Sequence, residues 1–330
     1  MATYKGIKGV KVVTKTSDPT ASEALGTVWY NSTSPAALKY AIEGAGTWAA
    51  SNPLNTARNA LGAQTGTQTA ALIMDGRGNE STLNVTELYD GTSWTEVADS
   101  VQSLYARGSF GTQTATISAG GNTGAMSNIT ESWDGTSWTN TGHGIGTARR
   151  DSCGCGIQTA GLITTGKTGT AVTGATETYN GSAWTEVGDV NTARQEVAAA
   201  NASPVTASLV FGGNPGAQAL TESWDGTTWT EVNNLVEGRT YMAGSGIQTA
   251  AFGISGHTTT PGVPGYTATT EQFDGTSWTE VADLASVRSG GGAAGSSSAT
   301  VTFGGYYIGT ITLTEEFTAP VYTVKTVTVS

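Results

Sequence analysis

Short runs in which apolar and polar residues alternate recur along the chain, and each is interrupted by Asp-Gly or Asn-Gly. Thr86–Val97 reads T-E-L-Y-D-G-T-S-W-T-E-V, and close copies begin at Thr130, Thr176, Thr221 and Thr270. Alternation of this kind is typical of a strand with one buried face and one solvated face. Asp-Gly and Asn-Gly tolerate the positive φ angles that tight hairpin turns require. The sequence therefore predicts a β-hairpin at each copy.

The hairpins recur at a nearly constant spacing, which makes each of them part of a repeat. Successive copies of the hairpin tryptophan lie 44 to 49 residues apart, and a series of arginines keeps a similar step. A period of about 46 residues, rich in glycine and without helical periodicity, is typical of one propeller blade of four short strands. Because both series have six members, the sequence predicts an all-β, six-bladed β-propeller of four-stranded blades. The members are Trp48, Trp94, Trp138, Trp184, Trp229 and Trp278, and Arg58, Arg107, Arg149, Arg194, Arg239 and Arg288.

The two ends of the chain predict how the ring closes. The last repeat contains a Thr314–Phe317 strand but no following tryptophan strand, whereas Leu38–Ala49 has that pattern before any repeat has begun. Pairing an N-terminal strand with the last blade removes exposed edges, so we expect a composite sixth blade, to which Leu38–Ala49 contributes one strand or two. The expected parts are an N-terminal arm at 1–37, the propeller at 38–317 and a C-terminal β tail at 318–330, for which Tyr4–Thr14 is an available partner.

Composition narrows the classes of function. The 330-residue chain has a net charge of −11 and a pI near 4.6, and it lacks the basic footprint that binding to nucleic acid or to an anionic membrane needs. Its 46 glycines and its low content of charged residues, 12%, fit many short strands joined by turns. Met1–Lys15 never reaches the apolar run of a signal peptide, and no segment is long enough for a transmembrane helix. We therefore expect synthesis in the cytoplasm and no membrane insertion.

Few residues offer catalytic or metal chemistry. Cys153 and Cys155 are too few for a disulfide framework, and the chain has only His143 and His257 as further soft ligands, so we expect buried thiols and no metal or cofactor. The two histidines stand in different repeats with no nucleophile motif beside them. No repeat departs from the pattern to supply an extra pair of carboxylates. We therefore expect no catalytic site.

The repeated charged residues have structural explanations. One carboxylate in each hairpin turn is too few for calcium and is explained by turn chemistry, at Asp90, Asp134, Asp225 and Asp274, with Asn180 in the same place. The repeated arginines have two explanations, an anion-attracting lining of the central channel or pairing with the glutamates that recur in phase. The in-phase glutamates favour pairing, because an unpaired buried charge is costly. These glutamates are Glu87, Glu131, Glu177, Glu222, Glu271, and Glu315 or Glu316.

The order of features within a repeat resembles a known family. In several repeats an apolar strand ends in Gly-Gly (Gly120–Gly121, Gly212–Gly213, Gly304–Gly305), an aromatic residue lies in the next strand, a Trp in the last and an Arg at the junction. In this order residues 38–317 resemble the kelch repeat. The near-identical G-T-Q-T-A and D-G-T-S-W-T-E-V blocks and the K-T-V-T-V-S ending also resemble kelch-like virion proteins of tailed, especially marine, bacteriophages. That resemblance implies a tail fibre, appendage or decoration, made in the host cytoplasm and bound to other virion proteins through 1–37 and 318–330. Self-association stays open.

The variation among repeats points to one face of the ring. The hairpin turns and the Q-T turns hardly change, whereas the loops after the apolar strands differ in length and composition, and strand alternation places those loops on the same face. Binding residues concentrate on loops held by a rigid scaffold. The longest loop, Ser255–Ala268, supplies the candidate residues His257, Pro261, Pro264 and Tyr266, the last as a stacking platform for a glycan.

The sequence therefore predicts a non-enzymatic virion protein that attaches to a host-surface glycan or protein receptor. One alternative is an architectural decoration or connector that binds other virion subunits. The other is a secreted kelch-like lectin or enzyme.

Overall fold

The structure, a computed structural model, describes residues 12–20, 27–33, 35–60, 63–259 and 265–327. These residues form strands and turns and contain no helix, and the strands build seven four-stranded sheets. The predicted all-β class is confirmed, but the predicted total of six sheets is wrong. The chain divides into two compact units, one comprising Met1–Thr47 with Ala319–Ser330 and the other Trp48–Thr318, whereas the sequence placed these boundaries at 37/38 and 317/318.

The seventh sheet belongs to the unit built from the two ends of the chain. Its strands are β1 (Val13–Lys15), β2 (Val28–Asn31), β3 (Ala37–Glu43) and β28 (Tyr322–Thr326), in the order β1-β2-β3-β28. The β1 and β2 strands are parallel, and the other pairs are antiparallel. The C-terminal tail thus pairs with β3, whereas residues 4–11 of its expected partner, Tyr4–Thr14, lie outside the described residues.

The buried core of this terminal sheet is formed around Trp29. Trp29 is 1% exposed, and its indole N–H donates a hydrogen bond to Asp18, 3.2 Å away. The Asp18 carboxylate also accepts hydrogen bonds from Asn31 at 2.7 Å and from Lys39 at 2.8 Å. These bonds lower the pKa of Asp18, that from Lys39 foremost. One acidic side chain therefore ties together the β2 and β3 strands of the terminal sheet.

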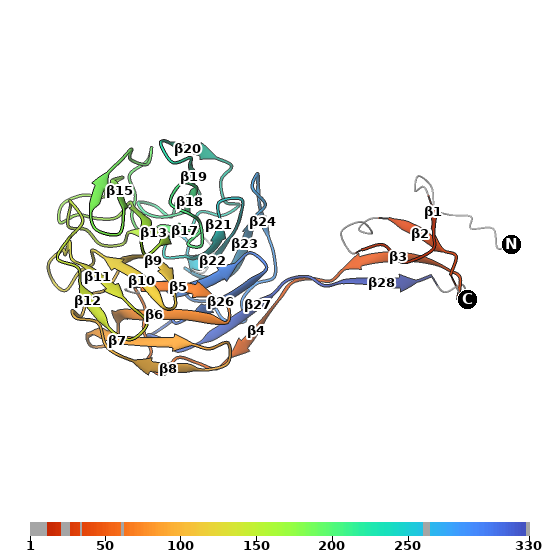
Figure 1. The fold of residues 1–330 in the computed structure, drawn as a ribbon, viewed down its shortest axis with the longest axis horizontal. Helices are drawn as coiled ribbons and strands as arrows, with labels where there is room; N and C mark the ends of the chain where they lie inside the picture. The colour runs from red at the N-terminus through yellow and green to blue at the C-terminus, as the bar shows by residue number, and fades with distance from the viewer. Residues whose placement is uncertain (1–11, 21–26, 34, 61–62, 260–264, 328–330) are drawn as a thin grey trace. The chain divides into compact units, whose positions relative to one another are not determined.

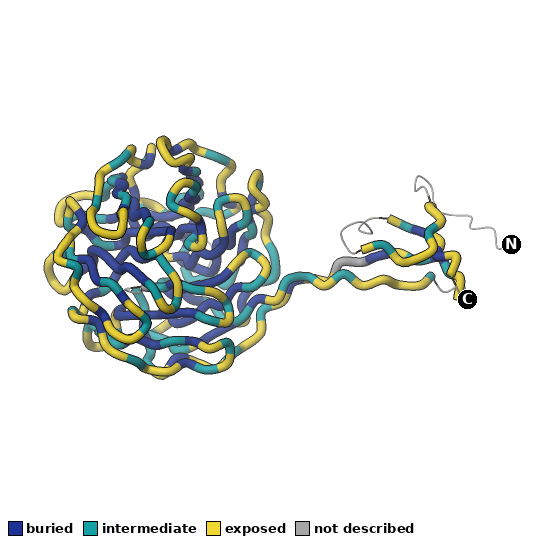
Figure 2. The backbone as a smooth tube through the Cα atoms, viewed as in Figure 1, coloured by how far each residue is buried: buried dark blue, intermediate teal, exposed yellow. Residues whose placement is uncertain are grey.

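The Trp48–Thr318 unit contains six sheets, of which the first five are antiparallel meanders that each follow one sequence repeat. The second strand of each sheet is buried because its apolar residues pack against the neighbouring sheets, as Leu162 and Ile163 do. Figure 2 shows the buried backbone toward the inside of this unit and exposed backbone along its rim. Figure 1 shows β5, β9, β13, β17 and β21 near the centre of this unit. The strands of the first five sheets are β5 (Ala63–Thr67), β6 (Ala70–Arg77), β7 (Thr82–Tyr89) and β8 (Trp94–Val97); β9 (Gly108–Thr112), β10 (Ala115–Ala119), β11 (Thr130–Trp133) and β12 (Trp138–Asn140); β13 (Cys153–Ile157), β14 (Ala160–Thr164), β15 (Thr176–Tyr179) and β16 (Trp184–Glu186); β17 (Ala198–Ala199), β18 (Ser208–Phe211), β19 (Thr221–Trp224) and β20 (Trp229–Val232); β21 (Ala243–Ile247), β22 (Ala250–His257), β23 (Tyr266–Phe273) and β24 (Trp278–Glu280).

The sixth sheet of this unit combines both ends of the repeat region. Its order is β25 (Gly292–Ser296), β26 (Ala299–Phe303), β27 (Thr314–Thr318) and β4 (Thr47–Ser51), so an N-terminal strand supplies the missing outer strand. The Trp48 ring lies 5.3 Å from the Phe317 ring, centroid to centroid. The Leu38–Ala49 segment is not a hairpin, however, because β3 belongs to the terminal sheet and only β4 joins the repeat sheets.

A closed cycle of six backbone hydrogen bonds links the sheets around the centre. In each repeat one residue before the innermost strand has a left-handed backbone, with φ between 45° and 64°, and its N–H donates to the carbonyl of the equivalent residue in the preceding repeat. The distances run from 2.7 to 3.2 Å, and the last residue receives a bond from the first. We call this cycle the hydrogen-bond ring. Its members are Ala60, Ala106, Asp151, Glu196, Tyr241 and Gly290.

The repeated arginines are buried in ion pairs with the repeated glutamates of the same sheet. In five repeats the guanidinium lies 2.6 to 2.8 Å from the glutamate, and each of these arginines is 0% exposed. The same glutamate accepts hydrogen bonds from backbone N–H groups of the incoming segment, as Glu87 does from Asn55 at 2.8 Å. The pairs therefore anchor the segment that enters each sheet. They are Arg58–Glu87, Arg149–Glu177, Arg194–Glu222, Arg239–Glu271 and Arg288–Glu315.

The hairpin tryptophans link neighbouring sheets. Each of five indole N–H groups donates to the hydroxyl of the first threonine in the preceding sheet's T-E motif, at 2.9 to 3.2 Å. Trp48 differs and donates to the Ala282 carbonyl at 2.9 Å. These bonds satisfy a buried donor that would otherwise be costly. The pairs are Trp94–Thr314, Trp138–Thr86, Trp184–Thr130, Trp229–Thr176 and Trp278–Thr221.

Candidate functional site

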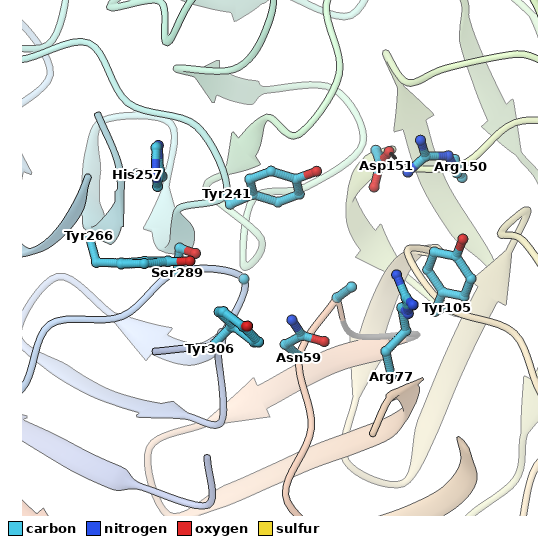
Figure 3. Close-up of a pocket in the computed structure, with 12 residues that line it drawn as sticks. Asn59, Arg77, Tyr105, Arg150, Asp151, Tyr241, His257, Tyr266, Ser289 and Tyr306 are labelled. Atoms are coloured by element: carbon cyan, nitrogen blue, oxygen red, sulfur yellow. Dashed lines mark hydrogen bonds and ion pairs between the residues drawn. The ribbon is translucent and has the colours of Figure 1, made fainter. Parts of the chain in front are cut away.

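A cavity of about 510 Å³ lies at the hydrogen-bond ring, on the side of the variable loops. Most of its lining comes from three equivalent positions in the repeats. These are the ring residue, the residue just before it, and the residue at or shortly after the end of the second strand. The last two are paired with each other through a β-bridge. Figure 3 shows the labelled side chains around a common opening. The lining residues are Asn59, Ala60, Arg77, Tyr105, Arg150, Asp151, Tyr241, His257, Tyr266, Ser289, Gly290 and Tyr306.

Backbone hydrogen bonds fix the two bridging positions in every repeat. The N–H groups of Thr240 and His257, for example, donate to each other's carbonyls at 3.0 and 2.8 Å. The backbone is thus the same in each repeat, while the side chain that it presents is free to vary. The bridged pairs are Asn59 with Arg77, Tyr105 with Asn122, Arg150 with Lys167, Gln195 with Asn214, Thr240 with His257, and Ser289 with Tyr306.

One wall of the cavity is aromatic. Tyr266 meets His257 edge to face at 5.2 Å, and its ring centroid lies 6.0 Å from that of Tyr306. Tyr307 packs against Tyr266 from outside the lining, 5.7 Å away. Figure 3 shows His257, Tyr266 and Tyr306 on one side of the opening, with Tyr241 above Ser289. Clustered tyrosines with their hydroxyls near solvent offer both an apolar face and hydrogen-bonding groups to a ligand.

The facing wall carries charge. The Arg77 guanidinium lies over the Tyr105 ring, 5.1 Å from its centroid, and Arg150 pairs with Asp151 at 2.6 Å. Burial raises the pKa of Asp151 to about 6, and the neighbouring Glu196 carboxylate adds to the rise, whereas Arg150 opposes it. Asp151 is therefore a buried carboxyl group at the cavity that titrates in the range where proton transfer at neutral pH is favourable.

Comparison with solved structures finds a protein of the same fold. A structure described as "Structure of YjhT" is similar with a TM-score of 0.67 and 11% sequence identity, over 82% of this chain and 99% of that chain. At this identity the likeness shows the fold alone, which is of the β-propeller type. No protein-family model matches the chain, and the comparison with curated proteins found no match.

The sequence-predicted loop residues divide into two groups. His257 and Tyr266 lie on the cavity wall, at the end of β22 and the start of β23. Pro261 and Pro264 lie outside the described residues. The loops expected after the apolar strands of the first and fifth repeats are partly strand. In the first repeat β6 continues to Arg77 and β7 begins at Thr82, and in the fifth β22 continues to His257 and β23 begins at Tyr266. The strand extension holds both His257 and Tyr266 in place at the cavity.

Sequence reasoning missed most of the lining. It did not single out Arg77, Tyr105, Arg150, Asp151 or Tyr241, although a signal was present. The two residues after each junction position change from repeat to repeat, whereas the junction position itself is arginine in five of the six repeats. The sequence analysis looked for an extra pair of carboxylates within one repeat, whereas the structure brings Asp151 and Glu196 together from two successive repeats as adjacent members of the hydrogen-bond ring.

The remaining candidates have structural roles. Among the described residues no group of three or more His, Cys, Asp or Glu side chains could hold a metal ion. Cys153 and Cys155 are free thiols whose pKa values burial raises to about 11 and about 12.

The hairpin carboxylates cap their own turns, and the bonds from Thr136 and Ser137 lower the pKa of Asp134 to about 2. His143 is exposed and does not line the cavity. In the part of the chain that the structure describes, no helix is long and apolar enough to cross a membrane.

Proposed function

We propose that the protein is a non-enzymatic attachment protein that binds a glycan in the cavity of a six-bladed, kelch-like β-propeller and is carried on the particle of a tailed phage. The observation that most supports this proposal is the aromatic wall of the cavity, in which backbone pairing holds Tyr266, Tyr306 and His257 in place. Sugar rings stack their C–H faces on such aromatic groups, while hydroxyls bond to polar neighbours. Asn59 and Ser289 supply neutral polar groups beside that wall.

The particle association rests on the sequence resemblance. The terminal unit, Met1–Thr47 with Ala319–Ser330, forms its own four-stranded sheet. We assign docking on other virion proteins to this unit and recognition to the Trp48–Thr318 unit. Mass spectrometry of purified particles, with localisation by an antibody to the terminal unit, tests the assignment. Absence of the chain from particles would contradict it.

Glycan binding is tested with the full chain on an array of oligosaccharides. We expect the wild type to bind a defined set of glycans and Tyr266→Ala to lose that binding, because the variant removes the centre of the aromatic wall. Thr276→Ala, in an exposed hairpin turn of the same repeat, is the matched control and should bind as the wild type does. An array on which the wild type binds nothing would favour an architectural role, as a decoration or connector.

An enzyme acting on the bound sugar is the second candidate, and Asp151 is the observation that favours it. Burial raises the pKa of its carboxyl to about 6, which suits proton transfer near neutral pH, and the Arg150 guanidinium lies 2.6 Å away. Incubating array-positive glycans with the protein and analysing them by mass spectrometry and NMR distinguishes the two functions. Conversion that Asp151→Asn abolishes would establish an enzyme, whereas unchanged glycans would support attachment.

A further inference from the structure

The cations of the Trp48–Thr318 unit are distributed unevenly. Between residues 48 and 318 the chain has nine Lys and Arg residues against 23 Asp and Glu residues. Six of the nine are the buried arginines that pair with carboxylates inside the sheets, and none of these six is more than 4% exposed. The other three are Arg77, Arg150 and Lys167.

Two of the three remaining cations line the cavity, and the third is paired with one of them. Arg77 and Arg150 line it, and Lys167 is bridged to Arg150 through the backbone. A strongly anionic unit repels anions from its surface in general, so a cationic wall at the cavity makes this place the one where an anion is attracted. Figure 3 shows Arg77 and Arg150 on the side opposite His257 and Tyr266. The cavity is therefore aromatic on one side and cationic on the other.

The guanidinium groups keep donors for a ligand. Arg77 is exposed, and among the described residues no carboxylate lies within ion-pair distance of it. Its recorded contact is the face of Tyr105, which leaves the N–H edge of the guanidinium open to an anion. Arg150 uses Nη1 for Asp151, and a guanidinium has five N–H donors in all. Both side chains can therefore bind an oxyanion in the forked geometry that arginine favours.

We propose that the ligand is a saccharide that carries an anionic substituent, bound by Arg77 and Arg150 while the sugar ring lies against Tyr266. The shared chemistry is a planar or tetrahedral oxyanion, and carboxylate, phosphate and sulfate are its three sources. This inference rests on the proposed glycan binding and adds the class of sugar. Arg77 is its main determinant, because Arg150 already shares its charge with Asp151.

The test uses paired glycans that differ only in the anionic group. Glucuronate-terminated, glucose-6-phosphate-terminated and galactose-6-sulfate-terminated oligosaccharides are arrayed beside their glucose- and galactose-terminated partners, and the best pair is titrated against the full chain. We expect at least one acidic glycan to bind tenfold or more tightly than its neutral partner, with an advantage that shrinks as NaCl is raised. The three acidic arms identify the source of the anion.

Variants then separate the local charge from the net charge. Arg77→Gln should remove most of the acidic preference. Lys325→Gln changes the net charge equally but lies in β28 of the terminal sheet, and should leave the preference intact. Equal binding of acidic and neutral partners, or an acidic preference that survives Arg77→Gln, would overturn this inference and leave glycan binding standing. Binding to no glycan at all would overturn both.

Discussion

The Arg107 guanidinium lies 3.1 Å from the Asp75 carboxylate, and both side chains are fully buried. The second repeat thus differs from the other five, in each of which one arginine pairs with one glutamate. At the position that holds arginine in the other five repeats the second repeat has Leu104, and Arg107 reaches Glu131 from three residues further on, at 3.4 Å. Asp75 occupies the place of the first glycine of the Gly-Gly doublet and has a left-handed backbone, φ 58°. One arginine thus forms ion pairs with two buried carboxylates.

Replacing Arg107 by methionine should be strongly destabilising. The variant leaves Asp75 and Glu131 buried without their cation, and breaking a buried pair in this way costs about 3–5 kcal/mol. Denaturant unfolding followed by tryptophan fluorescence measures the loss. Arg77→Met removes an exposed arginine from the neighbouring repeat and should change stability by less than about 0.5 kcal/mol. Equal effects of the two substitutions would contradict the assigned role of Arg107.

The stability of the protein should depend on pH through Asp75. Burial raises the pKa of Asp75 to about 7, against 3.8 for an ordinary aspartate, and the Arg107 charge and the bond from Ser100 only partly oppose this rise. Between these pH values the folded protein keeps a proton that the unfolded chain has released. The contribution of Asp75 is therefore fully present below pH 4 and is lost as pH rises toward 7, with a slope of up to about 1.4 kcal/mol per pH unit.

Asp75→Asn isolates this contribution because the amide does not titrate. The Tm of the wild type minus that of Asp75→Asn, measured by calorimetry between pH 5 and pH 8, should fall as pH rises. Other titrating groups are common to both proteins and cancel in the difference. A difference that stays constant over this range would show that Asp75 titrates as an ordinary carboxyl.

The repeat fold was predictable because its signals are local and recur in phase. Asp-Gly turns, alternating strands and one tryptophan per hairpin each specify a short segment, and the missing last strand pointed to Trp48 beside Phe317. The terminal sheet could not be predicted in the same way. Alternation in Leu38–Ala49 shows that strands form but not which sheet each of them joins, and β3 finds its partner in β28, far away in sequence.

The cavity was only partly predictable for a similar reason. Variation among the loops pointed to the face on which His257 and Tyr266 lie. The hydrogen-bond ring, in contrast, places Ala60 and Tyr241 in left-handed conformations that their residue types do not favour. The closed cycle of backbone bonds imposes that conformation, and a cycle through all repeats leaves no local sequence signature.

The tryptophan bonds between sheets provide a matched pair of threonine variants. Thr86→Val removes the hydroxyl that accepts the Trp138 indole N–H at 2.9 Å, leaves a buried donor unpaired, and should cost about 1–3 kcal/mol. Thr270 occupies the same place in the fifth repeat, but its hydroxyl has no hydrogen-bond partner within the described residues, because Trp48 donates to Ala282 instead. Thr270→Val should therefore be neutral or stabilising in the same unfolding measurement. Similar losses in both variants would show that the tryptophan bond is not the cause.

Phe110 and Gly161 form a size-matched pair across neighbouring sheets, and they allow packing to be tested by a double-mutant cycle. The Phe110 position on the innermost strand holds Thr65, Ser245 or Ala294 in other repeats, and a Cβ added to Gly161 would lie 2.0 Å from the Phe110 ring. Gly161→Ala should therefore overpack the site and cost about 1–3 kcal/mol.

In a Phe110→Ala background the ring is gone, so the added methyl group of Gly161→Ala should be tolerated or should fill part of the cavity. Phe110→Ala alone should cost about 3–5 kcal/mol, because it empties a fully buried site. The cycle should thus give a coupling free energy of about 1 kcal/mol or more, with the double variant more stable than the sum of the single losses predicts. Additive losses would mean that the backbone around Gly161, and not the Phe110 ring, excludes a side chain there.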